Sequence, residues 1–445
     1  MNFLTDYRLE NYILNTKYAD LPTEVKDRLR GCLIDLVGAL LVGTRSEQFA
    51  VGLRFAERVF GEGNIAVIGT KKRLSTIGAA IAMGHASNAY DIDDGHNITR
   101  THPGTSFIPA LLAVGYERDI TLGELLSAMD VSYETSVRAG AALMDYYKYA
   151  HSSGTFGAIG IAAGVSKILG FTKEMTNNAL SVAEFNAPLV PGIRSVEYPS
   201  MNKDGVPFGV SIGMLAIEES RDGFTGNKHI LEADEYRHYL DTLGDEHTVM
   251  SLYFKPYPCC RWAHPAIDAL TYTMRENAIR PDDIEHITVY TFLRATMLSK
   301  IKPKTCDEAQ YNIAYPTATA AVYGTFGINH TMDEALADQR VLDMMDRLSF
   351  EVDPELDAKF PSLRLSRVTV RTKDGREYSS PTFEPSGEAK DNIGIEWLIE
   401  KFKRITAPVI TSAAQDKILA QILESEQLPL RTLVDTIASP ENFIL

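Results

Sequence analysis

The chain has 445 residues, of which 45% are hydrophobic and 23% are charged, and its formal net charge is −15. This composition is typical of a globular protein, and the length exceeds the size at which one core usually stops growing, so we expect two domains. The negative charge argues against nucleic acid and against an anionic membrane surface as partners. An anionic substrate would therefore have to be bound by cations that are gathered locally.

The first half of the chain is predicted to be helical. Residues 21–43 place apolar side chains at helical spacing, and a Leu-Pro-Thr start and Gly43 bound the segment. Residues 75–90 predict a second helix, so rich in Gly and Ala that neighbouring helices can approach it closely. Further helices are expected over 106–118, 122–142, 154–169 and 173–186. Together these segments predict an all-helical bundle.

The pattern changes near residue 250. Residues 284–292 and 363–372 alternate apolar and polar side chains, and an Asp-Gly turn follows the second segment, so both are predicted strands. Helices are expected over 262–278, 306–325 and 333–347, and again over 394–404, 411–423 and 428–437. We therefore predict a mainly α protein. Its all-helical bundle domain comprises residues 1–249 and 385–445, and a smaller α+β lid domain, residues 250–384, is inserted into it.

The sequence also predicts where the protein resides. The first residues lack the basic start, the continuous apolar run and the cleavage site of a secretory signal, and no apolar stretch reaches the roughly 18 residues of a membrane span. The cysteines are Cys32, Cys259, Cys260 and Cys306; they do not have C-x-x-C metal spacing, and adjacent cysteines do not pair readily. We expect a reduced, cytoplasmic protein.

A dense polar cluster follows the second predicted helix. The stretch "AYDIDDGHNITRTHPG", residues 89–104, contains Asp91, Asp93, Asp94, His96 and His102. One interpretation is a hydrogen-bonded loop whose aspartates cap the next helix. A second is a metal site, although no spacing here matches a known metal-binding motif. A third is general acid/base chemistry, with His102 held by carboxylates that fix its tautomer and raise its basicity.

Later segments favour the acid/base interpretation. His151 precedes a glycine-punctuated helix start whose free N–H groups suit an anion. Lys203 lies in a loop of Gly and Pro, and Lys255 and Arg261 flank a stiff, Pro-rich turn. Each of these residues alone is more often structural or solvated than functional. Together they predict a site in which histidines transfer protons and cations bind carboxylates.

Six segments in order along the chain resemble the MmgE/PrpD family: "GHASNAYDIDD", "THPGTSFIPALLA", "AHSSGTFGAIGIAAGVSKILG", "NKDGVPFGVSIGMLAIEESRDGFTG", "KPYPCCRWAHPAIDA" and "AQYNIAYPTATAAVYG". The resemblance spans nearly the whole chain, and the family includes 2-methylcitrate dehydratase, cis-aconitate decarboxylase and iminodisuccinate epimerase. It implies a helical bundle with an α+β lid, an active site between them, homodimers, and catalysis without a metal or an organic cofactor.

The resemblance also implies site residues. Its active-site aspartate falls on Asp91, its histidines on His102 and His151, its lysines on Lys203 and Lys255, and its tyrosine on Tyr315. The chain departs from cis-aconitate decarboxylases in carrying Gly95 where they have a Thr, and Cys260 where they have a lid histidine. The loop before His102 is also one residue longer than theirs. These departures argue against decarboxylation.

We therefore predict a cofactor-independent lyase that abstracts a proton next to a carboxylate and eliminates water from a small hydroxy di- or tricarboxylate. His102 is the expected base, oriented by Asp91, and His151 or Tyr315 the acid, while the substrate is bound by Lys203, Lys255, Arg261 and Cys260. The alternative is an epimerase of an imino- or amino-dicarboxylate such as iminodisuccinate. A cis-aconitate-type decarboxylase and a non-catalytic carboxylate-binding protein are less favoured.

Overall fold

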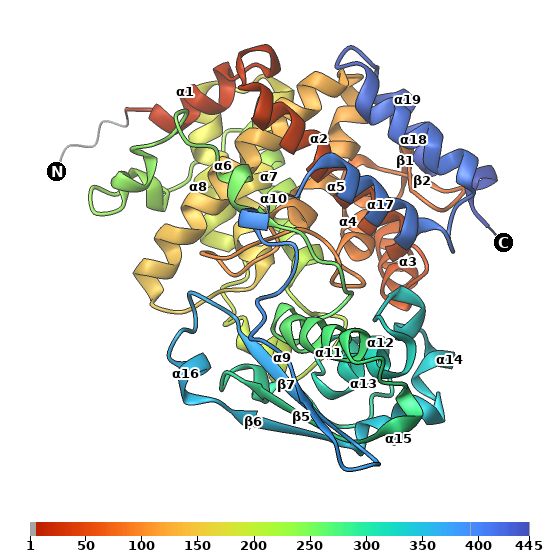
Figure 1. Cartoon of the computed structure of the whole chain (residues 1–445). Helices are drawn as coiled ribbons and strands as arrows, with labels where there is room; N and C mark the ends of the chain where they lie inside the picture. The colour runs from red at the N-terminus through yellow and green to blue at the C-terminus, as the bar shows by residue number, and fades with distance from the viewer. Residues whose placement is uncertain (1–5, 392, 445) are drawn as a thin grey trace.

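The structure, a computed structural model, describes residues 6–391 and 393–444. A larger part built mostly of helices lies above a smaller part that contains a four-stranded sheet (Figure 1). The predicted mainly α fold with a small α+β part is confirmed. Among the described residues, no helix has the length and apolar character needed to cross a bilayer.

The helices are spread along the whole described chain. They are α1 (Arg8–Asn15), α2 (Thr23–Gly43), α3 (Glu47–Phe60), α4 (Thr76–Ser87), α5 (Pro103–Arg118), α6 (Leu122–Tyr147), α7 (Ser153–Leu169), α8 (Lys173–Asn186), α9 (Ile193–Glu197), α10 (Val206–Arg221), α11 (His264–Glu276), α12 (Cys306–Gln310), α13 (Ala314–Tyr323), α14 (Asp333–Leu336), α15 (Gln339–Met345), α16 (Pro354–Asp357), α17 (Ile395–Thr406), α18 (Ser412–Glu424) and α19 (Leu430–Ala438).

The strands form three small sheets. Strands β1 (Glu62–Ala66) and β2 (Arg73–Leu74) pair antiparallel, as do β3 (Gly95–His96) and β4 (Leu252–Tyr253). The third sheet has the order β6 (Leu348–Val352), β5 (Ile284–Thr291), β7 (Ser366–Thr372) and β8 (Glu377–Ser379). In it β5 runs parallel to β6 and antiparallel to β7. The β3–β4 pair joins the polar loop after α4 to the start of the second half.

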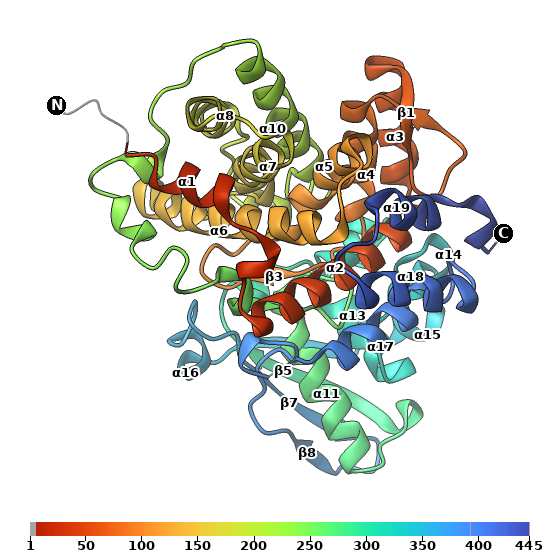
Figure 2. The ribbon, with the colours of Figure 1, turned by 90° about the horizontal axis from the view of Figure 1, so that it is seen from above.

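Helix α7 is the centre of the helical part. It packs against α5, α6, α8 and α10, and the two views together show it enclosed by them (Figures 1 and 2). Its glycines permit this approach, since a Cβ atom on Gly157 would lie 2.2 Å from the Cβ atom of Ser106 in α5. Helix α4, the Gly- and Ala-rich second helix of the sequence, is also approached by several neighbours: it contacts α2, α3, α5 and α10.

The buried apolar side chains form two cores. The larger core contains α2, α4–α8 and α10, together with the C-terminal helices, and the smaller is built around α11, α13, β5 and β7. Helix α17 returns to α2, where Leu398 and Phe402 lie against Gly31 and Gly38. The chain therefore re-enters the helical part at its C-terminal end. The domain limits at residues 250 and 384 stay a prediction.

Two predicted helices are interrupted in the structure. The segment 306–325 is divided into α12 and α13, because the Asn312 side chain accepts a hydrogen bond from the Tyr315 N–H and donates one to the Ile301 carbonyl. The segment 333–347 is likewise divided into α14 and α15. Helices α1, α3 and α10 and strand β6 were not predicted.

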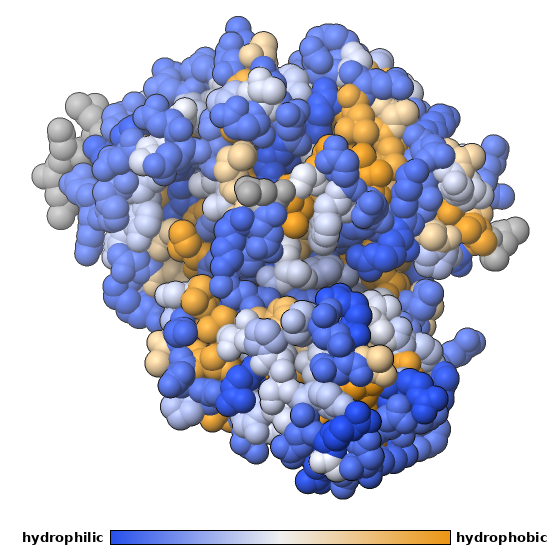
Figure 3. Space-filling view, viewed as in Figure 1, coloured by the Kyte–Doolittle hydropathy of each residue, from blue (hydrophilic) through white to orange (hydrophobic). Residues whose placement is uncertain are grey.

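The face in Figure 3 is mostly hydrophilic, with hydrophobic side chains visible only in patches between elements.

Candidate active site

One cavity of about 490 Å³ is lined by residues of both parts of the molecule. That volume lies in the range of small-molecule sites. The helical part contributes Asp91, His102, His151 and Asp204 to its wall, and the second half contributes Tyr253, Cys260, Arg261 and Tyr311. The cavity therefore brings together polar residues that are far apart in the sequence.

The loop after α4 holds its first carboxylate in an unusual backbone conformation. Asp91 has φ = 49°, in the left-handed region that residues other than glycine rarely adopt. Its buried Oδ1 atom lies 2.6 Å from the Nζ atom of Lys255. The β3–β4 pairing sets Gly95 opposite Tyr253 and so keeps Lys255 beside this loop. Strained backbone held by the surrounding structure is typical of functional sites.

His102 is held by carboxylates on both ring nitrogens. Its Nδ1 atom lies 2.8 Å from the Asp94 carbonyl oxygen and 3.1 Å from Oδ2 of Asp93, and its Nε2 atom lies 3.4 Å from Oδ1 of Asp91. Burial by itself lowers the pKa of His102, but the charges of Asp93 and Asp91 raise it well above its ordinary value. The raised pKa favours the protonated imidazolium of His102, which can give a proton.

The third aspartate of the loop, Asp94, has a structural role. Oδ1 of Asp94 accepts a hydrogen bond from the Gly104 N–H at 3.1 Å, in the first turn of α5, and Oδ2 accepts one from the Tyr133 hydroxyl at 2.5 Å. Burial, aided by neighbouring carboxylates, raises the pKa of Asp94 to about 7. The structural interpretation of the polar cluster thus describes Asp94, whereas Asp91 and Asp93 hold the histidine.

His151 lines the same cavity in the opposite charge state. It lies between α6 and α7, where its ring packs against Tyr149 and Phe156. Both ring nitrogens are buried, and neither has a hydrogen-bond partner in the part of the chain that the structure describes. Burial lowers the pKa of His151 to about 4, so its imidazole is neutral at neutral pH. A neutral imidazole beside a cavity can accept a proton.

The two predicted lysines lie behind the cavity wall. The Nζ atom of Lys203 contacts the Ala89 carbonyl, Oε1 of Gln310 at 2.9 Å and Oδ1 of Asp307 at 3.1 Å. Burial by itself lowers the pKa of Lys255, but the Asp91 carboxylate raises it above its ordinary value. Within the described chain, neither lysine is among the residues that line the cavity. Both hold the loop after α4 in place.

Arg261 and Cys260 do line the cavity. The Arg261 guanidinium lies over the Tyr253 ring at 4.5 Å, and its Nη2 atom lies 2.8 Å from Oε1 of Glu388. Its charge is therefore already balanced by a carboxylate. Burial raises the pKa of the Cys260 thiol to about 12, so it stays uncharged.

Tyr315 lies elsewhere. Its hydroxyl donates to the His330 carbonyl at 2.8 Å and to the Ala335 carbonyl at 3.1 Å, and it is not among the described residues at the cavity wall. Tyr311, four residues earlier, does line the cavity and donates to Oδ2 of Asp204 at 3.2 Å. Burial raises the pKa of Tyr311 well above its ordinary value, so it keeps its proton. The family resemblance implied Tyr315, whereas Tyr311 is the tyrosine of this segment that lies at the cavity wall.

Sequence reasoning missed other wall residues, namely Asp204, Arg100, Arg294 and Arg364. Asp204 directly follows Lys203, and Arg100 precedes His102 by two positions, so both lay inside motifs already singled out. Arg294 and Arg364 had a weaker signal: Arg294 lies just beyond the predicted strand 284–292, and Arg364 is the second residue of the predicted strand 363–372. The antiparallel register, with Thr291 opposite Ser366, brings those two ends together.

The cavity also contains a group that could ligate a metal. Asp91, His102 and Asp204 each offer one ligand atom, and these atoms lie within 4.8 Å of one another. However, the Lys255 ammonium 2.6 Å from Asp91 and a protonated His102 oppose a divalent cation there. The sequence-based expectation of a site without a metal stays a prediction.

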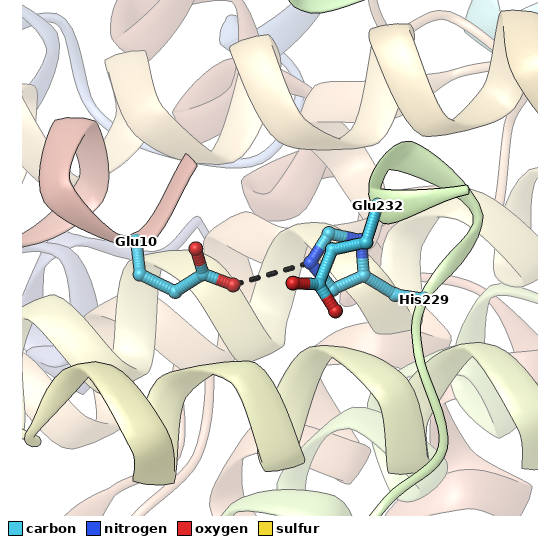
Figure 4. Close-up of side chains that lie close together, drawn as sticks. All are labelled: Glu10, His229 and Glu232. Carbon is cyan, nitrogen blue, oxygen red and sulfur yellow. Dashed lines mark hydrogen bonds and ion pairs between the residues drawn. The ribbon is translucent and has the colours of Figure 1, made fainter. Parts of the chain in front are cut away.

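A second buried histidine–carboxylate cluster, drawn in Figure 4, shares no residue with the described cavity wall. It consists of Glu10 in α1 with His229 and Glu232, which follow α10. The Nε2 atom of His229 lies 3.2 Å from Oε1 of Glu10, which also accepts a hydrogen bond from the Asn177 amide at 2.9 Å. This cluster ties α1 to the segment after α10.

Comparison with known proteins matches both halves of the chain. Residues 7–247 match the MmgE/PrpD N-terminal domain, and residues 257–426 match the MmgE/PrpD C-terminal domain. A cis-aconitate decarboxylase-like protein of Aspergillus oryzae is 26% identical, over 94% of this chain and 93% of the relative. Cis-aconitate decarboxylase of Aspergillus terreus is 22% identical, over 92% and 90%.

Cis-aconitate decarboxylase of Homo sapiens is also 22% identical, over 96% of this chain and 93% of the relative. The two matched ranges include every described residue of the cavity wall except Tyr253. With its N-terminal and C-terminal domains both matched in chain order, the protein belongs to the MmgE/PrpD family.

Proposed function

We propose that the protein is a lyase that removes water from a small hydroxylated di- or tricarboxylate, after abstraction of a proton next to a carboxylate. One observation carries the proposal: His102 and His151 line one cavity, and their surroundings shift their pKa values in opposite directions. Titratable groups whose pKa values are pushed apart by their surroundings are the usual signature of an acid and a base acting together.

The charge states assign the roles. His151, which is neutral, accepts the proton from carbon; the C–H electrons form the C=C bond, and the C–O bond breaks. The hydroxyl leaves as water with the proton that His102 donates. Our sequence interpretation favoured His102 as the base, and its raised pKa is the reason to reverse the roles. Tyr311 takes the place foreseen for Tyr315 as a hydroxyl near the reacting atoms.

The groups behind the wall support His102. Asp93 accepts a hydrogen bond from Asn88 and faces Nδ1 of the ring, so it fixes the orientation of the imidazolium. Burial by itself raises the pKa of Asp93, but the charge of His102 lowers it below its ordinary value. The Nζ atom of Lys255 lies 2.6 Å from Oδ1 of Asp91 and so balances this carboxylate beside the ring. These contacts hold a charged acid in a buried position, which is costly without partners.

Incubation in deuterated water tests the assignment. The wild type, His151→Gln and His102→Asn are each incubated with a panel of hydroxy di- and tricarboxylates, and exchange at carbon and product are read by NMR. We expect His151→Gln to lose exchange and product, and His102→Asn to lose product while keeping exchange. Full product formation by His151→Gln would contradict the proposal. Tyr315→Phe serves as the control that keeps both.

Decarboxylation is the second candidate, because the relatives quoted above are named as cis-aconitate decarboxylases. A local contact argues against it. A Cβ atom on Gly95 would lie 2.2 Å from Cζ of Tyr253, so the threonine expected of those enzymes cannot stand here beside Tyr253. Cys260 replaces their lid histidine with a neutral thiol. The same NMR panel separates the outcomes: loss of CO₂, loss of water, or reprotonation without loss, as in an epimerase.

The homodimer implied by the family resemblance and the cytoplasmic location stay predictions. Several large apolar side chains are exposed on or beside the segment that lines the cavity, among them Phe185, Tyr198 and Phe208. Covering them with a second copy would remove apolar surface from water. Light scattering on the purified protein tests the dimer.

A further inference from the structure

We propose that Arg100, Arg294 and Arg364 form a separate anion subsite of the cavity, which binds the carboxylates far from the reacting carbon and selects a tricarboxylate over a dicarboxylate. All three line the cavity, and each comes from a different segment. As an account of substrate selection the inference rests on the proposed function, but the binding it predicts can be measured without turnover.

The backbone brings the three residues to one place. Arg100 has φ = 56° and lies in a tight turn, where its N–H donates to the His96 carbonyl at 2.8 Å and His96 bridges to Thr101. The turn fixes Arg100 two residues before His102. Arg294 follows the end of β5, and Arg364 precedes the start of β7, which pairs with β5. Two parts of the molecule thus contribute to one arginine group.

These arginines have no carboxylate of their own. In the regions 6–391 and 393–444, none of the three guanidinium groups has a carboxylate oxygen within 4.0 Å. The other cations of the cavity wall do: Arg261 pairs with Glu388 and Lys148 with Asp145. The lysines behind the wall are paired as well, Lys255 with Asp91 and Lys203 with Asp307. The chain has 59 acidic and 44 basic residues, so carboxylates are not scarce.

Arg364 gives the strongest support for the anion subsite, because this arginine is only 5% exposed. Its Nη1 atom donates to the amide oxygen of Asn97 at 2.7 Å, and the Asn97 amide donates in turn to Glu388 at 2.6 Å. The guanidinium is therefore positioned by a neutral group and keeps its charge unbalanced. A buried, unpaired cation is costly, and an anion in the cavity would balance it.

The three charges also face one another. Burial lowers the pKa of Arg100, and the neighbouring charges of Arg364 and Arg294 lower it further. This repulsion disappears when an anion binds among them. The planar guanidinium group matches a carboxylate with two parallel hydrogen bonds, so three such groups suit more than one carboxylate.

The rest of the cavity explains why this subsite determines specificity. The lysines nearest His102 are paired and lie behind the wall, so they leave little positive charge for the substrate. A dicarboxylate bound at the reacting end would leave the arginines partly unbalanced, whereas a tricarboxylate reaches both ends. Inorganic phosphate has similar anion chemistry, so it must be compared directly.

Binding to the full-length protein tests the subsite. Trp262 lines the cavity, so its fluorescence reports occupancy, in a Trp397→Phe background that removes the only other tryptophan. The probes are tricarballylate, glutarate and inorganic phosphate. We expect tricarballylate to bind at least about tenfold more tightly than glutarate, as lost charge-assisted hydrogen bonds predict. Equal affinities for the two, or tighter binding of phosphate, would overturn the proposal.

Variants locate the effect. Arg100 and Arg294 are exposed, so the double variant R100Q/R294Q should fold, and it should lose the preference for tricarballylate. R376Q, which removes an exposed arginine of the β7–β8 turn, is the matched control and should keep the preference. Arg364→Lys keeps the buried charge and should weaken tricarballylate more than glutarate. A preference that survives in R100Q/R294Q would contradict the assignment.

The test also separates this inference from the proposed reaction. His102→Asn should abolish turnover yet keep the preference for tricarballylate, because the arginines remain. If His102→Asn instead keeps full turnover, the proposed reaction fails while the subsite stands. If R100Q/R294Q binds both probes as the wild type does, the subsite fails while the reaction stands.

Discussion

Two buried histidine–carboxylate clusters in this protein are alike in their local contacts and different in their surroundings. At His102, carboxylates of Asp91 and Asp93 lie within 3.4 Å of the ring; at His229, Glu10 lies at 3.2 Å. In both clusters burial lowers the histidine pKa, and the carboxylates more than offset this and raise it. Each belongs to a group of three ligand atoms within 4.8 Å.

The surroundings separate the two. His102 lines a cavity that also contains a neutral histidine and arginines without carboxylate partners, and its loop includes Asp91 in a left-handed conformation. Glu10, His229 and Glu232 are all buried, and none of them is among the described residues that line this cavity. A shifted pKa alone therefore does not identify an active site. What distinguishes His102 from His229 is its access to a cavity and the unbalanced charge in that cavity.

The largest expected effect is on activity and concerns the cluster around His102. His102→Asn removes the proton donor but keeps a side chain that can donate to Asp93, so the protein should fold. We expect kcat/KM to fall by about a thousandfold or more, which corresponds to about 4 kcal/mol of transition-state stabilisation. Steady-state kinetics with the substrate found by the NMR panel measure this. A loss below about tenfold would place the acid elsewhere.

The next largest effect is on stability and concerns the cluster around His229. His229→Asn breaks a buried ion pair and leaves Glu10 and Glu232 without a balancing charge. We expect the free energy of unfolding to fall by roughly 3 kcal/mol, with little change in kcat/KM. Denaturant titration measures the first quantity and kinetics the second. An inactive variant of unchanged stability would show that the comparison is wrong.

A smaller effect distinguishes two tyrosines. Tyr311→Phe removes the hydroxyl that donates to Asp204 at the cavity wall, and we expect kcat to fall by about tenfold to a hundredfold. Tyr315→Phe removes a hydrogen bond to backbone carbonyls, and we expect a loss of about 1 kcal/mol in stability with unchanged kcat. The opposite result would return the catalytic role to Tyr315.

The sequence predicted those parts of the fold whose pattern is local. Helices α2 and α5–α8 and strands β5 and β7 lie where the apolar spacing indicated, and Asp91, His102 and His151 lie at one cavity, as the motifs suggested. The edge strand β6 had a weak pattern, because none of its side chains is fully buried.

Residues that depend on tertiary contacts could not be predicted in the same way. Glu10 meets His229 across more than two hundred positions, and Arg294 meets Arg364 through strand register. The lysines were expected to bind substrate because isolated cations suit carboxylates. Which cations are already paired depends on the folded chain, and the sequence shows no sign that Asp307 and Asp91 balance Lys203 and Lys255.

The smallest effect concerns the pH dependence of the second cluster. Burial raises the pKa of Glu10, but the hydrogen bond and charge of His229 bring it below the ordinary value of 4.5; His229 lies above its ordinary 6.5 because Glu10 offsets burial. The contribution of His229 to stability is thus complete below 6.5 and is lost as the pH rises through its folded pKa. The contribution of Glu10 is complete above 4.5 and is lost as the pH falls through its folded pKa.

The stability difference between the wild type and His229→Asn should therefore be largest between pH 4.5 and 6.5. It should shrink in alkaline solution by a fraction of the roughly 3 kcal/mol total. Unfolding measured across this range checks it; a constant difference would mean that His229 is neutral, as His151 is.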